Sequence, residues 1–427
     1  MILGTDKKMS SLKPFDGRVA SGRCRGCDGA VSEVLSFGDM PLANALLGPD
    51  DRGESEARFP LTLSFCPTCA LVQLVESIDP ARLFRDYRYA SSNSPSFLAH
   101  AKTLAQRLIQ DRGLDTNRLV VELGSNDGYL LQHYRDSGIA VLGIEPATEI
   151  ANIARRQGIP TESAFFSRDF ALGLNARGVT ADVVHANNVL AHVPDLPGFV
   201  AGIGALLKPE GVAVIEFPYL LDLVEGLEFD SIYHEHRCYF SLTPLIGIFR
   251  AAGLTVVDVE RLDVHGGSLR LFASHQAKAS PSPAVAAMLA AERQWGVGDM
   301  IRYRRFADAV RAFQPKLGDF LGALRRRGHS IAAYGASAKG AVLLNYCGVG
   351  RELLDFVVDA NPLKQGLAMP GVRLPILPTE ELRRRQPDFT LLLAWNFAEE
   401  IAAQQDAYLQ AGGRFIMPTP EPHLYGA

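Results

Sequence analysis

The stretch VVELGSNDGYLL, residues 120–131, is the starting point for reading the fold of this chain. The apolar run that begins at Arg118 predicts a strand through Leu123, and the pattern continues as a helix after Gly128. Glycine adopts positive φ without strain and lets a ligand approach the backbone, so Gly124 and Gly128 predict a ligand-binding turn. Their spacing differs from the GxGxxG pattern of dinucleotide-binding loops.

Strands alternate with helices on both sides of this turn. The predicted elements are, in chain order, a helix at Phe97–Gln110, a strand at Ala140–Ile144, a helix at Ala147–Gln157, a strand at Ala181–His185, a helix at Leu196–Leu207 and a strand at Gly211–Phe217. This alternation is typical of a parallel, doubly wound α/β sheet. An antiparallel pair within residues 261–273 is expected to close the sheet. We assign residues 81–280 to this domain.

A second, smaller α/β unit follows an Ala/Arg-rich helical connector at residues 277–327. Its strands are predicted at residues 330–334, 354–358, 389–394 and 414–417. The loop GASAKG, residues 335–340, opens a helix and can present backbone N–H groups to a phosphate, although a plain strand-to-helix turn is the alternative. The predicted nucleotide-binding residues of this domain, residues 281–427, are Tyr334, Gly335, Ser337, Lys339, Gly340 and Asn361.

Two CxxC pairs lie in a proline-rich segment with short extended runs. Each pair turns two thiolates toward one point, and the four sulfurs of Cys24, Cys27, Cys66 and Cys69 suit a tetrahedral Zn²⁺ ion. The segment at residues 21–80 is too short to hold a good core alone, so we predict a β-rich module with a structural zinc. Four free buried thiols are the alternative.

Composition and charge exclude several classes of protein. The 427 residues carry 43 Lys and Arg against 47 Asp and Glu, and this balance argues against nucleic-acid binding. No apolar run is long enough to span a membrane, and the N-terminal segment lacks the hydrophobic core of a secretory signal. We therefore expect a cytoplasmic protein without nucleic-acid or membrane partners. Its oligomeric state stays open, with a monomer as one option.

Polar residues follow two of the predicted strands. Glu145 comes directly after the strand Ala140–Ile144, and Asn187, Asn188 and His192 follow the strand Ala181–His185. Ligands of open α/β sheets bind at the carboxyl ends of strands, and an acid after the second strand is placed to accept hydrogen bonds from ribose hydroxyls. A nicotinamide-binding sheet or a sheet without a cofactor is the alternative.

Tyr233, His234, Glu235 and His236 stand in a row within EFDSIYHEHRCYFS. Such a polar run rarely serves packing. A histidine titrates near neutrality and can act as a general base, and a neighbouring carboxylate can orient it or raise its basicity. A metal site is a weaker interpretation, because the run lacks the spacing of HExxH. An inert surface cluster is the other alternative.

These motifs together resemble one family, the three-domain sugar C-methyltransferases. The resemblance extends from about Arg23 to the end of the chain and rests on CRGC, CPTC, YRYASS, VELGSNDGYLL, GIEP, NNVLAHVPD, YHEHRCYFS, YGASAKG and VVDANP. It implies a class I methyltransferase domain with a Rossmann-like sheet, a zinc module before it and a Rossmann-like nucleotide-sugar domain after it. Members of this family methylate carbon 3 of a 4-keto-6-deoxy sugar carried on thymidine diphosphate, with S-adenosylmethionine as the methyl donor.

The resemblance also assigns residues. Its catalytic and substrate-pocket set matches Tyr87, His192, Tyr233, Glu235 and His236, with His236 as the base. The residues expected to bind S-adenosylmethionine are Glu122, Gly124, Ser125, Asn126, Gly128, Glu145, Asn187 and Asn188. A carbon nucleophile needs an adjacent ketone, a base for the α-proton and donors for the enolate oxygen. The expected substrate is therefore a nucleotide-diphosphate-linked ketosugar, with O- or N-methylation of a similar metabolite as the alternative.

Overall fold

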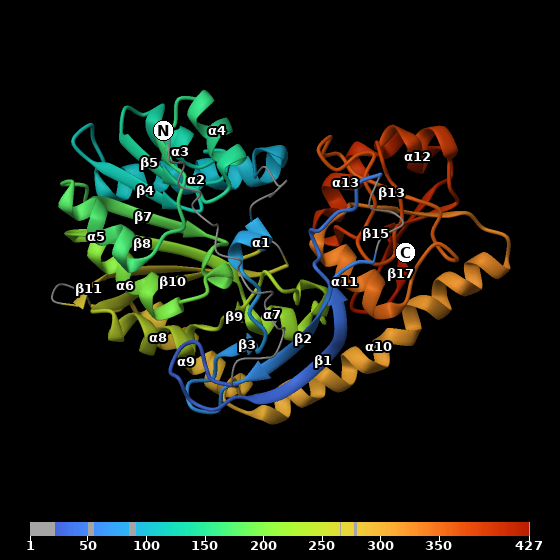
Figure 1. Ribbon diagram of the computed structural model, residues 1–427, viewed down its shortest axis with the longest axis horizontal. Coiled ribbons are helices and arrows are strands. Elements are labelled where there is room, and N and C mark those ends of the chain that lie inside the picture. The colour runs from blue at the N-terminus through green and yellow to red at the C-terminus, as the bar shows by residue number, and fades with distance from the viewer. Residues whose placement is uncertain (1–21, 50–54, 85–90, 265, 277–279, 427) are drawn as a thin grey trace, which may run out of the picture.

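The computed structural model describes residues 22–49, 55–84, 91–264, 266–276 and 280–426. Three sheets carry the fold, and Figure 1 shows two α/β lobes joined underneath by long strands and a long helix. The N-terminal sheet has the order β1-β2-β3-β9. Its strands are β1 (Ser32–Pro41), β2 (Arg58–Phe65), β3 (Val72–Leu74) and β9 (Cys238–Tyr239).

The middle sheet has the order β10-β11-β8-β7-β4-β5-β6. Its strands are β4 (Leu119–Leu123), β5 (Ala140–Ile144), β6 (Thr161–Glu162), β7 (Ala181–Asn187), β8 (Leu207–Pro218), β10 (Leu254–Leu262) and β11 (Ser268–His275). Strands β6, β5, β4, β7 and β8 run parallel, whereas β11 and β10 complete the sheet as antiparallel strands. The doubly wound sheet and its antiparallel closing pair are therefore confirmed.

Helices cover both faces of the middle sheet. The helices of this region are α1 (Pro80–Phe84), α2 (Pro95–Arg112), α3 (Leu131–Arg135), α4 (Thr148–Arg156), α5 (Arg168–Ala176), α6 (Leu196–Leu206), α7 (Leu220–Glu225) and α8 (Leu242–Ala251). Apolar residues of α5, α6 and α8 pack on one face, and those of α2 and α3 pack on the other. The carboxyl ends of the parallel strands thus remain available for a ligand.

The C-terminal sheet has the order β14-β13-β12-β15-β16-β17. Its strands are β12 (Ile331–Tyr334), β13 (Val357–Val358), β14 (Ile376–Leu377), β15 (Phe389–Leu392), β16 (Arg414–Met417) and β17 (His423–Leu424). The helices are α9 (Pro283–Trp295), α10 (Met300–Arg326), α11 (Ala338–Cys347), α12 (Glu380–Arg385), α13 (Ala398–Gln404) and α14 (Asp406–Gln410). The predicted helical connector is divided into α9 and α10 because Gly296 caps α9 in the left-handed conformation, at φ 91°.

The N-terminal sheet shares its core with the C-terminal domain. Phe65 of β2 packs against Tyr303 of α10, with ring centroids 4.8 Å apart, and Phe37 of β1 packs edge-on against Tyr346 of α11 at 5.0 Å. These residues belong to one apolar cluster that extends into the C-terminal sheet. The small module therefore gains its core from neighbouring domains. In the part of the chain that the structure describes, no helix is long and apolar enough to cross a membrane.

Candidate active site and zinc centre

The four predicted cysteine ligands converge in the N-terminal module. One ligand atom from each of Cys24, Cys27, Cys66 and Cys69 lies within 4.8 Å of the others. The Sγ atoms of Cys24 and Cys69 are 3.4 Å apart, and those of Cys27 and Cys66 are 3.6 Å apart. Four sulfurs at this separation fit a tetrahedral Zn²⁺ ion and leave no position for a catalytic water. A zinc ion at this site would be structural.

Backbone turns explain why the cysteines face one point. The N–H of Asp28 donates to the Cys24 carbonyl, and the N–H of Ala70 donates to the Cys66 carbonyl, each at 2.8 Å. Asp28 and Ala70 have φ angles of 60° and 64°, so both CxxC pairs close in the same left-handed way. The two turns are therefore local structures that the tertiary fold brings together.

The glycine loop of β4 has the conformation that its sequence predicts. Gly124 and Gly128 have φ angles of 64° and 86°. A Cβ atom on Gly124 would lie 2.5 Å from Val189, and one on Gly128 would lie 2.9 Å from Ile159. The backbone therefore passes too close to its neighbours for a larger residue at either position.

Glu145 lies against this loop. Its Oε2 accepts from the N–H of Asn126 at 2.9 Å, and its Oε1 accepts from the N–H of Ala147 at 2.8 Å. Burial raises the pKa of Glu145 to about 7 although both backbone bonds lower it. Each carboxylate oxygen has a further lone pair, so a ribose with two hydroxyl donors fits this carboxylate.

Replacing Glu145 by alanine should weaken S-adenosylmethionine binding by about 1–3 kcal/mol, the range of a charge-assisted hydrogen bond. Calorimetry measures the dissociation constant, and Glu149→Ala, an exposed acid on α4, is the matched control. Ribose hydroxyls favour the ionised form of the Glu145 carboxylate. The affinity of the natural protein for S-adenosylmethionine should therefore fall as the pH drops below about 7. An unchanged dissociation constant in Glu145→Ala would show that Glu145 is not the acid that binds the ribose.

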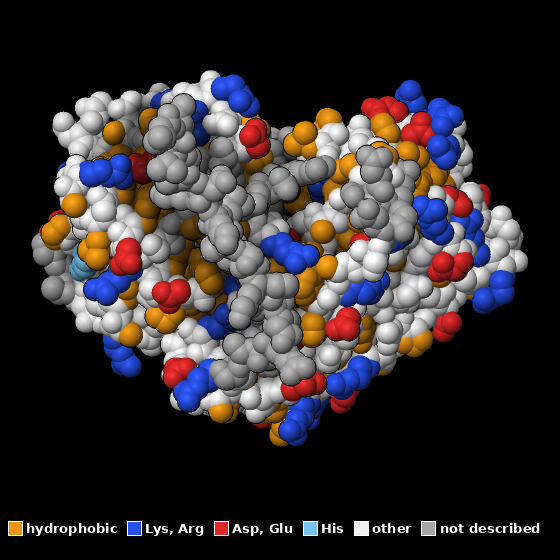
Figure 2. All heavy atoms as spheres, in the orientation of Figure 1, with side chains coloured by type: hydrophobic (Ala, Val, Ile, Leu, Met, Phe, Trp, Pro, Cys, Tyr) orange, Lys and Arg blue, Asp and Glu red, His pale blue; other side chains and the backbone are white. Residues whose placement is uncertain are grey.

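A cavity of about 790 Å³ lies between the two α/β lobes. Figure 2 shows the face on which these lobes are separated by a hollow. The cavity is lined by residues of all three regions, and the predicted site residues among them are Gly124, Asn126, Glu145, Asn187, Asn188, His192, Tyr233, Glu235, His236, Ser337 and Lys339. The glycine loop after β4, which is the candidate cofactor loop, and the polar run near residue 235 therefore face one space.

Other predicted residues lie outside the described lining of this cavity: Glu122, Ser125, Gly128, Tyr334, Gly335, Gly340 and Asn361. Gly335 and Gly340 are needed for packing, because a Cβ atom on either would lie 2.7 Å from the chain segment after β15. Ser337 caps α11 by accepting from the Gly340 N–H at 3.0 Å, and its hydroxyl donates to the Leu393 carbonyl at 3.2 Å. The plain strand-to-helix turn thus explains much of GASAKG, and the role of Ser337 in nucleotide binding stays a prediction.

Tyr233 and His236 form a bonded pair across a tight turn. The N–H of His236 donates to the Tyr233 carbonyl at 2.9 Å. The Nδ1 of His236 lies 3.0 Å from the Ser231 carbonyl, which only accepts, so Nδ1 carries the proton. The Tyr233 hydroxyl then donates to Nε2 at 2.7 Å. Burial lowers the pKa of His236 well below its ordinary value, so the imidazole is neutral and able to accept a proton.

Glu235 does not orient His236 as the sequence suggested. Both of its oxygens accept from the amide of Asn44, at 2.7 and 2.9 Å, while Ser231 and Tyr233 take the two ring nitrogens of His236. The reason is the turn, which sends consecutive side chains in different directions. Burial raises the pKa of Glu235 to about 7.

His192 lies beside this pair. Its ring centroid is 4.9 Å from that of His236, and its Nδ1 is 2.9 Å from the main-chain carbonyl of Glu235. Burial lowers the pKa of His192 to about 4, so this ring is also neutral at pH 7. The structure therefore places a second imidazole next to the candidate base.

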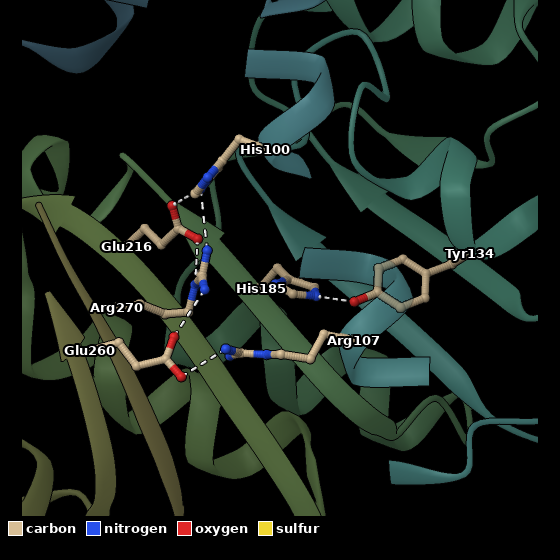
Figure 3. Close-up of polar contacts among 7 residues, drawn as sticks. All are labelled: His100, Arg107, Tyr134, His185, Glu216, Glu260 and Arg270. Atoms are coloured by element: carbon tan, nitrogen blue, oxygen red, sulfur yellow. Dashed lines mark hydrogen bonds and ion pairs between the residues drawn. The ribbon is translucent and has the colours of Figure 1, made fainter. Parts of the chain in front are cut away.

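A row of charged groups supports the cofactor side of the cavity (Figure 3). Glu216 of β8 accepts from Arg270 of β11 at 2.7 Å and lies 2.8 Å from the Nε2 of His100 on α2. Glu260 of β10 accepts from Arg270 at 3.0 Å and from Arg107 of α2 at 2.8 Å. These bonds attach α2 to the sheet. Phe97 at the start of α2 lines the cavity, so the network has a positioning role.

Lys339 reaches the cavity from α11. Its Nζ lies 3.7 Å from Glu228 and 4.2 Å from the centroid of the Trp395 ring. The indole N–H of Trp395 donates to Asp230 at 2.7 Å, which links the C-terminal and middle domains at this point. Lys339 is thus a cation between acidic and aromatic neighbours.

Tyr87 lies outside the described residues. The next part of YRYASS is described, and it is bonded to the glycine loop. The N–H of Ser91 donates to the Asn126 side chain at 2.8 Å, and Ser92 donates to Asp127. Ser91 and Ser92 therefore lie against the glycine loop, and Ser91 lines the cavity.

Among the polar residues of the cavity that sequence reasoning missed are Asn44 and Lys364. Lys364 comes two residues after the quoted segment VVDANP, so its position after a strand was a usable signal. Asn44 lies in a segment of otherwise ordinary composition and gave no signal. Only the fold brings it to Glu235.

Comparison with known proteins identifies the family. The chain is 40% identical to C-methyltransferase NovU of Streptomyces niveus, over 92% of this chain and 94% of that protein. The chain belongs to the C-methyltransferase family. Three family descriptions match in the expected order: "Putative zinc binding domain" at residues 24–84, "Methyltransferase domain" at 97–259 and "C-methyltransferase C-terminal domain" at 263–420. This C-methyltransferase uses S-adenosylmethionine, which fits the glycine loop and Glu145.

Other proteins match a smaller share of the chain. Ubiquinone biosynthesis O-methyltransferase of Methylocella silvestris is 30% identical over 28% of this C-methyltransferase and 50% of its own length. The PH0226 protein of Pyrococcus horikoshii OT3 aligns with 46% of this chain and 99% of its own, with 17% identity and a TM-score of 0.36. Magnesium protoporphyrin IX methyltransferase from Synechocystis aligns with 42% of this chain and 83% of its own, with 18% identity and a TM-score of 0.34.

Proposed function

We propose that this C-methyltransferase methylates a nucleotide-diphosphate-linked 4-keto-6-deoxy sugar at carbon 3, next to the ketone. The observation that carries the proposal is the shared cavity, in which the neutral His236 faces the same space as the cofactor loop and two lysines of the C-terminal domain. A carbon acid next to a ketone needs a base that is unprotonated at neutral pH, and His236 meets this need.

Proton removal is assigned to Nε2 of His236. Tyr233 donates to this atom at 2.7 Å, so its hydroxyl must turn away before Nε2 takes the α-proton. A hydroxyl released in this way can donate to the ketone oxygen, where negative charge develops in the enolate. The Ser231 carbonyl holds the other ring nitrogen and stabilises the imidazolium that forms. S-adenosylmethionine supplies the electrophilic methyl group when bound.

Lys339 and Lys364 are the lysines of the described cavity lining, and both come from the C-terminal domain. A nucleoside diphosphate carries at least two negative charges, so these ammonium groups favour its binding. Lys364 donates to the Ala336 carbonyl at 2.8 Å, which places its charge beside the GASAKG loop. The assignment of this domain to the nucleotide rests on these two cations.

A panel of nucleotide-linked ketosugars tests the proposal. The protein should transfer a labelled methyl group from S-adenosylmethionine to a thymidine-diphosphate-linked 4-keto-6-deoxy sugar, and carbon NMR should place the label on carbon 3. The same sugar with its ketone reduced is the control, because it cannot form an enolate. A methyl group on oxygen or nitrogen, or equal transfer to the reduced sugar, would contradict the enolate mechanism.

A further inference from the structure

The segment after β1 carries the N-terminal module to the C-terminal domain. Leu42 and Leu47 are buried, and Leu47 exchanges backbone hydrogen bonds with Ala368 in both directions, each at 2.9 Å. Figure 1 shows this blue segment beside the red C-terminal lobe. Asn44 lies between these two anchors and lines the cavity. The backbone on both sides of Asn44 is therefore anchored, by the buried side chain of Leu42 before it and by the buried side chain and main-chain bonds of Leu47 after it.

The amide of Asn44 bonds both carboxylate oxygens of Glu235. Its Nδ2 lies 2.7 Å from Oε1 and 2.9 Å from Oε2. A carboxylate only accepts and an amide nitrogen only donates, so the direction of this contact is fixed. Glu235 is 3% exposed, which leaves little water to replace a lost donor. One nitrogen that bonds two oxygens fixes the direction in which the carboxylate faces.

Several charged or titratable groups surround Glu235. Lys364 approaches from the C-terminal domain, with Asp359 at 3.7 Å from its Nζ. His192 bonds the main-chain carbonyl of Glu235, and His236 follows it in the chain. Burial raises the pKa of Glu235, whereas Asn44 and Lys364 lower it. Asn44 of the N-terminal module and Lys364 of the C-terminal domain thus both counteract the rise that burial causes in the pKa of Glu235, a residue of the middle domain.

We propose that Asn44 is a positioning residue, through which the zinc-binding module fixes the orientation and the ionised form of Glu235 in the active site. The inference rests on the proposed function and on the place of Glu235 in the catalytic set that the family resemblance implies. This role gives the N-terminal module a part in the chemistry as well as in folding. Among the described residues, no side chain of the middle domain donates to both carboxylate oxygens of Glu235 as Asn44 does.

Asn44→Leu removes the donor and keeps the volume. Without this hydrogen bond the carboxylate of Glu235 loses stabilisation, so its pKa should rise. If the ionised form is required, the acidic limb of the kcat/KM profile should move up by roughly one to two pH units. Activity should recover at high pH, which a misfolded variant would not show. Ser36→Ala, an exposed polar deletion on β1, is the control and should leave the profile in place.

A double-mutant cycle separates this role from a structural one. In the Glu235→Gln background the carboxylate is absent, so adding Asn44→Leu should change kcat/KM less than twofold. Equal losses in both backgrounds would overturn the inference. If Asn44→Leu does not fold, Asn44→Asp serves in its place, because a second carboxylate of similar size should raise the pKa of Glu235 further.

A titration without substrate tests the inference apart from the proposed function. Carbon-13 NMR of glutamate-labelled protein follows the Glu235 carboxyl, whose signal is assigned by its loss in Glu235→Gln. Its midpoint should rise in Asn44→Leu, and an unchanged midpoint would overturn the role of Asn44. Full activity of Glu235→Gln would instead contradict the catalytic role that the family resemblance implies for Glu235.

Discussion

Replacing His236 by asparagine should lower turnover by about 10²–10⁴-fold, the range for a general base, while S-adenosylmethionine still binds. Turnover falls because the variant loses the Nε2 lone pair that faces Tyr233. Cofactor binding persists because the glycine loop after β4 is a separate element. Turnover with a labelled methyl donor and calorimetry with the cofactor measure the two effects. The matched control is His234→Gln, because His234 bonds the Pro60 carbonyl of the N-terminal module and glutamine keeps a donor there.

Proton exchange gives a second observable for His236. With S-adenosylhomocysteine bound, the ketosugar should exchange its α-proton with deuterated water in the natural protein. The exchange should disappear in His236→Asn and persist in Tyr233→Phe, because the phenyl ring leaves Nε2 free. Full exchange in the His236 variant would remove this histidine from the mechanism. Glu235 or His192 would then be the candidate base.

Cys66→Ala should remove zinc and lower the free energy of unfolding by roughly 4–5 kcal/mol or more, because metal binding is folding free energy in such modules. Cys66 is fully buried between β2 and β3, and its partners come from both CxxC turns. Metal analysis and denaturant unfolding measure the two effects. Cys347→Ala is the control, since Cys347 lies outside the cysteine cluster and should leave the zinc content at about one per chain.

Chelation of the natural protein should lower its stability before it changes the methyl-transfer step. The ion has four sulfur ligands, so it has no position for substrate. Active protein that contains no zinc after careful purification would contradict the assignment. Equal destabilisation by Cys66→Ala and Cys347→Ala would also contradict it.

Local patterns in the sequence were sufficient for the cofactor loop, the cysteine turns and most helices and strands. Gly124 and Gly128 indicate a backbone conformation that only glycine adopts easily. That conformation depends on residues that are close in the sequence. The CxxC turns close through hydrogen bonds within five residues. Strand β9 was not predicted, because a two-residue strand has no periodicity and owes its existence to pairing with β3.

The orientation of the candidate catalytic groups depended on tertiary structure. The row Tyr233–His236 predicted a polar cluster, but a tight turn separates its side chains, so that His236 bonds Ser231 and Tyr233 instead of Glu235. The partner of Glu235 is Asn44, 191 residues away in the chain. A contact of this kind leaves no local pattern, because it depends on how three domains pack around one cavity. The residue types limit the chemistry that is available at this site, and the packing of the domains sets which of these residues meet there.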